Sequence, residues 1–346
     1  MIVEDQTQSV RLRAWLTGPA WAVLLVTLAL ARLFPVWCAH WQFVPFIIGM
    51  VFLGLPHGAL DHLAPLRLLH RRLTWRYLVL FVLGYGALVC AYLVFWRVWP
   101  GGALAAFLLL SWLHWGQGDA YFLRTFAGQA PPKSAAEGLL VWAVRGGLPI
   151  VLPVLAVPFV FTQVARGILG WYGPSGGWVL TDSVRDGGLA LFGGLLLAYW
   201  ARSWRRGAFG LDLAETALLL TYFWLVPPIL AVGVYFCVWH SARHVARLTM
   251  LDLRPDETLV RCLGRQTIQA LPMTLGALAM LGGLLAWHGR HHVSAADLTY
   301  LYLSLIAALT FPHFLLVLWM DRQELGQDGR NAVVVGGRRD AVRDGL

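Results

Sequence analysis

A long apolar run of this chain ends in the sequence Tyr235-Phe-Cys-Val-Trp-His240-Ser-Ala-Arg-His244-Val-Ala-Arg247. His240 and His244 are four residues apart, so on a helix they share one face and can bind the same metal ion. Two other apolar runs each contain a histidine at a comparable depth, His57 and His114. An imidazole among membrane helices is costly to bury, so several of them in one chain indicate a functional site.

The composition is that of a membrane protein. Of the 346 residues, 58% are hydrophobic and 13% are charged, which differs strongly from the balance found in soluble domains. Apolar runs of roughly 20 residues recur along the chain, and each is long enough to cross a bilayer as a helix. We therefore expect an all-α, polytopic integral membrane helical bundle of about ten transmembrane helices, with about eight or nine as the alternatives.

The apolar runs also set the expected helix boundaries. We expect helices over about residues 14–37, 42–64, 77–98, 103–123, 136–161, 187–203, 266–287 and 297–320, and two more within 211–248. Pro227-Pro228 should divide the run 211–248, because a proline disfavours helix in the residue before it. The glycine-rich stretch 162–186 is expected to form a long outer loop.

The charge distribution indicates a topology rather than a nucleic-acid partner. The net charge is +9, but the arginines cluster in short loops between apolar runs, as is typical of inner-surface loops that contact anionic membrane lipid. We therefore expect a multi-pass protein of the cell membrane with both termini in the cytoplasm. On this topology, residues 1–13 form a cytoplasmic N-terminal segment, 14–322 the transmembrane catalytic domain and 323–346 a mobile cytoplasmic tail.

In this topology, five histidines fall at one depth, between the bilayer centre and the inner surface. They are His57, His114, His240, His244 and His313. Single-helix propensity does not require this agreement, so we predict that the five side chains meet and that the first four bind a metal. Imidazole suits iron, copper, zinc and nickel, so the ligand type leaves the metal open. A set without thiolates suits redox iron or catalytic zinc.

Two carboxylates and several aromatic residues lie near these histidines in the sequence. Asp61 follows His57 by four residues and either orients an imidazole or forms a charge at a helix end. Asp119 likewise either orients an imidazole on another helix or forms a charge at a helix end. We expect His313 to support the ligands by hydrogen bonding rather than to bind the metal. Three tryptophans beside the site histidines could line an apolar pocket: Trp112, Trp115 and Trp239.

Four motifs together resemble one known family. They are Gly54-Leu-Pro-His57-Gly-Ala-Leu-Asp61, His114-Trp-Gly-Gln-Gly-Asp119, Trp239-His240-Ser-Ala-Arg-His244 and Phe311-Pro-His313. In this order, from about residue 50 to 320, they resemble the Brp/Blh family, the bacteriorhodopsin-related β-carotene 15,15'-dioxygenases. Gly118 is a mild departure, since the family commonly has alanine before this aspartate.

The resemblance implies a reaction and a cofactor. The family holds Fe(II) with four histidines, which correspond motif by motif to His57, His114, His240 and His244 as catalytic metal ligands. It implies cleavage of the central 15,15' double bond of β-carotene by O2 to give two all-trans-retinal. The implied partners are β-carotene or a related carotenoid, O2 and membrane lipid, with a rhodopsin as a possible consumer of retinal. A hydrocarbon substrate of this length further predicts a tunnel that opens sideways to lipid.

Two alternatives use the same residues differently. Another histidine–metal membrane oxygenase or desaturase would typically carry several histidine boxes of the HxxHH kind, and this sequence has one HxxxH instead. A non-enzymatic membrane protein could bind a carotenoid, or could use buried histidines to relay protons during transport. A transporter would more typically show two repeated halves, which we do not find.

Overall fold

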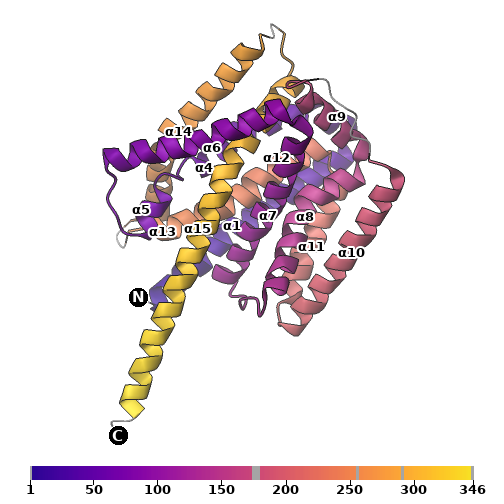
Figure 1. The fold of residues 1–346 in the computed structure, drawn as a ribbon. Coiled ribbons are helices and arrows are strands. Elements are labelled where there is room, and N and C mark those ends of the chain that lie inside the picture. The colour runs from indigo at the N-terminus through magenta and orange to yellow at the C-terminus, as the bar shows by residue number, and fades with distance from the viewer. Residues whose placement is uncertain (1, 174–179, 255–256, 290–291, 344–346) are drawn as a thin grey trace.

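The computed structural model describes residues 2–173, 180–254, 257–289 and 292–343, with side chains for residues 13–324 of these ranges (Figure 1). Every regular element within the described ranges is a helix. Among the described residues, five helices are long and apolar enough to cross a membrane, and a bent pair, Pro35–Trp41 with Phe43–Gly58, would make a sixth. The expected all-α membrane bundle is confirmed, whereas the expected count of ten is not.

The helices follow one another with short connections. Their bounds are α1 Ile2–Leu33, α2 Pro35–Trp41, α3 Phe43–Gly49, η1 Met50–Gly54, α4 Leu55–Gly58, α5 Ala64–Leu68, α6 Trp75–Val98, α7 Pro100–Thr125, α8 Ala135–Ala156, α9 Pro158–Leu169, α10 Asp182–Arg205, α11 Phe209–Leu225, α12 Pro228–Tyr235, η2 Phe236–Ser241, α13 Ala242–Asp252, α14 Leu259–His288 and α15 Ala295–Arg343. The two segments marked η are π-helical. Figure 1 shows α7, α8, α10 and α11 side by side, with α15 running along the bundle and projecting from it.

Prolines divide the chain at two places. The run 211–248 is interrupted between Leu225 and Pro228, as expected. The stretch 162–186 is not a continuous loop, because Pro158 begins the helix α9, which continues to Leu169. Proline at the first helical position loses no hydrogen bond there, so it can start a helix after the break at Val157. Residues 174–179 of the predicted loop lie outside the described residues.

The predicted N-terminal segment and tail remain predictions. The backbone of α15 is helical as far as Arg343, but the side chains beyond Glu324 lie outside the described residues. The same holds for the side chains of residues 2–12 in α1. The structure therefore gives no information on whether the two ends of the chain lie in the cytoplasm.

Glycines allow α7 and α8 to touch along their backbones. A Cβ added to Gly116 would lie 2.1 Å from the carbonyl oxygen of Trp142, and one added to Gly146 would lie 1.9 Å from that of Trp112. The indole N–H of Trp112 donates a hydrogen bond of 2.8 Å to the carbonyl oxygen of Ala143. Small residues at a membrane helix interface permit this close approach. The contact sets the position of α7, which carries His114.

Glycines also allow the two π-helical segments to pack closely against each other. A Cβ added to Gly54 in η1 would lie 2.8 Å from the Phe236 ring in η2. At Gly49, an added Cβ would lie 3.0 Å from the sulfur of Cys237. The segments that precede His57 and contain His240 therefore pack directly against each other.

Gly146→Ala should destabilise the bundle by about 1–3 kcal/mol, because the new methyl group would overlap a backbone carbonyl that cannot rotate away. The matched control is Gly193→Ala in α10, where an added Cβ meets no atom within 4 Å. That substitution should be neutral or stabilising by up to about 1 kcal/mol, since alanine favours helix over glycine. Denaturant unfolding in mild detergent measures both, and equal stability of the two variants would contradict the close contact.

Candidate metal centre

The five histidines that the sequence places at one depth lie together in the structure. The ring centres of His57 and His240 are 5.6 Å apart, and those of His57 and His244 are also 5.6 Å apart. His114 lies 4.9 Å from His240. His313 lies 4.8 Å from His114, 5.0 Å from His244 and 5.2 Å from His57. All five side chains are buried, so helices far apart in the sequence build one imidazole cluster.

The π-helical segments orient two of these rings. Such segments insert an extra residue into a helical turn and are frequent at functional sites. η2 contains His240, and η1 ends just before the turn that carries His57. Nδ1 of His57 pairs with the carbonyl oxygen of Gly54. Because a carbonyl only accepts, Nδ1 carries the proton, which leaves Nε2 of His57 with a free lone pair.

Unpaired nitrogens point to a ligand for the cluster. Nε2 of His240, of His244 and of His313 is buried with no hydrogen-bond partner among the described side chains, as is at least one ring nitrogen of His114. A buried polar atom without a partner is unfavourable, so native proteins nearly always satisfy such atoms. Several unpaired imidazole nitrogens in one place are what a metal ion would coordinate.

Asp61 acts on His313 rather than on His57. Nδ1 of His313 donates to the Asp61 carboxylate, at 2.8 Å and 2.9 Å from its two oxygens. The hydroxyl of Tyr85 donates to the same carboxylate at 3.0 Å. Candidate ligand atoms of Asp61, His244 and His313 lie within 4.8 Å of one another, so this buried group could hold a metal. A carboxylate that fixes the tautomer of an imidazole is typical around metal sites, and Tyr85 was not recognised from the sequence.

The cluster borders an apolar cavity of 280 Å³. Four of the histidines line it, together with residues of α6, α14 and α15. The cavity reaches Val82 on α6 and Gly276 on α14, and both are exposed on helices apolar enough to span a membrane. It therefore reaches the exposed surface between α6 and α14, two helices at the upper left of the bundle in Figure 1.

The three tryptophans near the histidines have different surroundings. Trp115 lines the cavity of 280 Å³ and a second cavity of 140 Å³. Trp112 lines neither of these two cavities and binds the backbone of α8. Trp239 lines neither of them as well, and its indole N–H donates to Asp119 at 3.0 Å.

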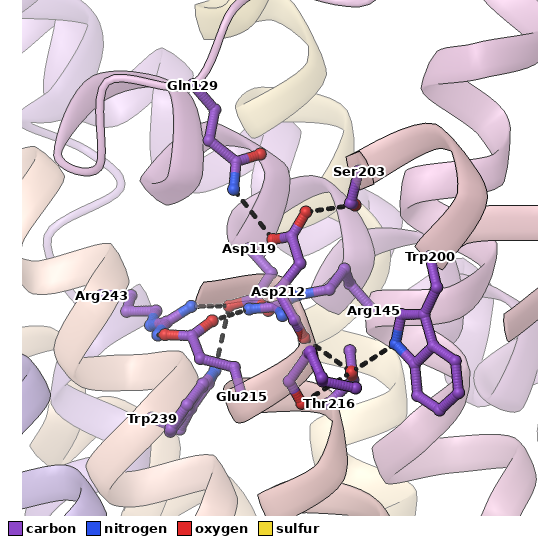
Figure 2. Close-up of polar contacts among 11 residues, drawn as sticks. Asp119, Gln129, Arg145, Trp200, Ser203, Asp212, Glu215, Thr216, Trp239 and Arg243 are labelled. Atoms are coloured by element: carbon purple, nitrogen blue, oxygen red, sulfur yellow. Dashed lines mark hydrogen bonds and ion pairs between the residues drawn. The ribbon is translucent and has the colours of Figure 1, made fainter. Parts of the chain in front are cut away.

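Asp119 belongs to a closed ring of charges beside the cluster (Figure 2). Arg145 contacts Asp119 at 2.6 Å and also pairs with Glu215. Arg243 contacts Glu215 at 2.7 Å and also pairs with Asp119. Each of the four side chains is almost completely buried. The ring joins α7, α8, α11 and α13, and its two positive and two negative charges cancel.

The charge ring holds the helix segment that carries two of the histidines. The guanidinium of Arg243 lies 3.9 Å from the ring centre of Trp239 and 4.1 Å from that of Phe122. Trp239 and Arg243 directly precede His240 and His244 in the sequence, so Asp119 acts on the neighbouring face of the same helix. The sequence did carry a signal for Arg145 and Glu215, because a charge within an apolar membrane run indicates function by default.

Glu215→Gln should destabilise the protein by about 3–5 kcal/mol, because it leaves two buried arginines with one carboxylate. The double variant Arg145→Met, Glu215→Leu removes one charge of each sign and leaves the Arg243–Asp119 pair intact. The double variant should therefore lose less stability than Glu215→Gln alone. Unfolding in detergent tests this, and a double variant less stable than the single one would show that the balance of charge is not the important factor.

Comparison with known proteins places the chain in a family. The family described as Beta-carotene 15,15'-dioxygenase matches residues 48–321. The chain is 40% identical to "Probable beta-carotene 15,15'-dioxygenase Blh" of Halobacterium salinarum (strain NRC-1), over 81% of this chain and 85% of that protein. It is 31% identical to "Probable beta-carotene 15,15'-dioxygenase Brp" of the same species (strain R1), over 60% and 58%. It is 26% identical to the "Beta-carotene 15,15'-dioxygenase" of an uncultured marine bacterium, 66A03, over 81% and 92%.

No solved structure matches the chain. The family match covers all four motifs on which the resemblance in the sequence rests. The chain therefore belongs to the beta-carotene 15,15'-dioxygenase family.

Proposed function

We propose that this protein cleaves the central 15,15' double bond of β-carotene with O2 to give two all-trans-retinal, and that it uses Fe(II). The observation that carries the proposal is a buried cluster of five histidines with unpaired nitrogens at the wall of an apolar cavity. The relatives are named for this reaction. Both oxygen atoms of one O2 would end in the two aldehydes as the carbon–carbon double bond breaks.

We propose His57, His114, His240 and His244 as the ligands of the iron. Imidazole nitrogens bound to one metal lie about 2.1 Å from it, so the ring centres of neighbouring ligands lie roughly 5 Å apart. Three pairs among the four rings, His57–His240, His57–His244 and His114–His240, have centres 4.9 to 5.6 Å apart, which supports such an arrangement. Bound there, Fe(II) would supply the O2 chemistry that no amino-acid side chain provides.

His313 extends this proposal beyond the four-histidine set. Its Nδ1 is held by Asp61 and its buried Nε2 has no partner, so it is oriented as a fifth candidate ligand. Asp61 would then act through His313, and Tyr85 would hold Asp61 in place. The expectation that His313 only supports the other ligands becomes the alternative to this assignment.

The cavity suits a hydrocarbon substrate. A carotene offers no group for hydrogen bonding, so shape and apolar contacts must position it. Phe236 packs against His57 and His240, with ring centres 5.2 Å and 5.4 Å away, and Trp115 lies 5.4 Å from His240. These two rings would hold the polyene against the imidazoles and exclude water from the reacting bond.

The remaining partners follow from the location. We propose a multi-pass protein of the cell membrane with cytoplasmic termini, supported by the arginine-rich loops of the sequence. The substrate dissolves in the lipid onto which the cavity opens between α6 and α14. We propose a rhodopsin in the same membrane as the acceptor of the retinal.

Cells that make β-carotene should accumulate retinal when they express this protein and should not when they express the variant His240→Ala, His244→Ala. The exposed His40→Ala is the matched control and should behave like the wild type. Chromatography of the pigments and metal analysis of the purified proteins provide the readouts. Carotene that copurifies with the wild type without any product would favour a carotenoid carrier, and two metal ions per chain would favour a desaturase-like centre.

Asp61→Asn should weaken metal retention about 10- to 100-fold, since loss of a group that orients a ligand typically costs this much. Tyr85→Phe removes only the hydrogen bond to Asp61 and should have a smaller effect in the same direction. Competition with a chelator measures metal affinity without reference to activity. Unchanged affinity in Asp61→Asn would mean that Asp61 and His313 lie outside the metal site.

A further inference from the structure

The second cavity lies directly behind the aromatic residues of the site. It has a volume of 140 Å³. Four residues line both cavities, namely Trp115, Phe236, Ile306 and Thr310. The partition between the two cavities is therefore a single layer of side chains, and two members of that layer contact His240.

The second cavity extends away from the histidines for the length of half a carotene. On α7 it reaches Leu104, and on α15 it reaches Leu303. Each is ten residues from a site histidine on the same helix, His114 and His313 respectively. Ten residues of helix span about 15 Å. A carotene about as long as the bilayer core is thick, roughly 30 Å, extends about half of that length on each side of its central bond.

The far end of this cavity is lined by α9 and is hydrocarbon in character. Val160, Phe161 and Val164 of α9 line it, and Leu104 packs with Ala165 and Leu301 in one buried cluster. The polar residues Ser111 and Thr310 line it as well, but the hydroxyl of Thr310 is hydrogen-bonded to the carbonyl oxygen of Ile306. The first cavity reaches the exposed surface between α6 and α14, and the second lies beyond the aromatic residues that contact His240.

We propose that the second cavity is the binding site for the leading half of the carotenoid, and that its depth sets which double bond is cleaved. This inference rests on the proposed function. The substrate would pass from lipid between α6 and α14, move past Trp115 and Phe236, and stop when its first ring meets α9. With about 15 Å of polyene beyond the histidines, the central bond lies at the cluster.

The test compares two substrates on variants that shorten the second cavity. Val160→Trp and Leu303→Trp fill it from two different helices, and Phe159→Trp is the control on the exposed neighbour of Val160. The substrates are β-carotene and β-apo-12'-carotenal, which keeps the 15,15' bond but lacks most of one half. Overfilling should lower the rate on β-carotene at least about tenfold, with much less effect on the shortened substrate. Any residual product from β-carotene should be a pair of unequal aldehydes.

Several outcomes would overturn the proposal. One is an equal loss of rate on both substrates with the product unchanged, which would mean general damage to the site. Another is a raised KM for O2 with no dependence on substrate length, which would make the second cavity a path for oxygen. Tryptophan variants that still cleave β-carotene centrally at the wild-type rate would also exclude it. If the wild type does not cleave β-carotene at all, the proposed function fails first, and this inference fails with it.

Discussion

Four charges buried in an apolar bundle constrain the rest of this structure. Asp119, Arg145, Glu215 and Arg243 can lie in the interior only because each arginine meets both carboxylates. A single unpaired charge at this depth would be far more costly than any one packing contact. The ring therefore requires α7, α8, α11 and α13 to meet in one arrangement, with Figure 2 showing how closely the partners face one another.

The histidine cluster depends on this arrangement. α7 supplies both Asp119 to the ring and His114 to the cluster, and the segment from η2 to α13 supplies Trp239 and Arg243 as well as His240 and His244. One face of each helix is thus fixed by ion pairs while the next face presents imidazoles to the cavity. Backbone contact at Gly116 and Gly146 keeps α7 and α8 at the separation that the Arg145–Asp119 pair requires. The histidine cluster and the charge ring therefore depend on the same packing of α7 against the segment from η2 to α13.

The surroundings of the cluster suit a substrate that never leaves the apolar phase. Polar nitrogens are confined to one wall, and the remaining lining is mostly aliphatic, aromatic or glycine. Such a lining can position a hydrocarbon only by shape, so in the proposed reaction the lengths of the cavities would select the bond that is cleaved. In the proposed reaction, the aromatic partition between them would place the reacting bond beside the histidines rather than at either end.

The sequence by itself determined the helical class, the break at Pro227-Pro228 and the family motifs, because hydropathy and proline act locally along the chain. It also predicted that the five histidines meet, and their rings do lie together in the structure. Only the tertiary structure decided which groups pair. Asp61 serves His313, 252 positions away, and Asp119 serves Arg145 and Arg243 rather than an imidazole. The tertiary structure alone also decided that α9 packs against α8 and α15 and that a second cavity lies behind Trp115. Such pairings depend on the rotation of each helix about its axis, and that rotation is set by contacts between helices rather than by any one helix alone.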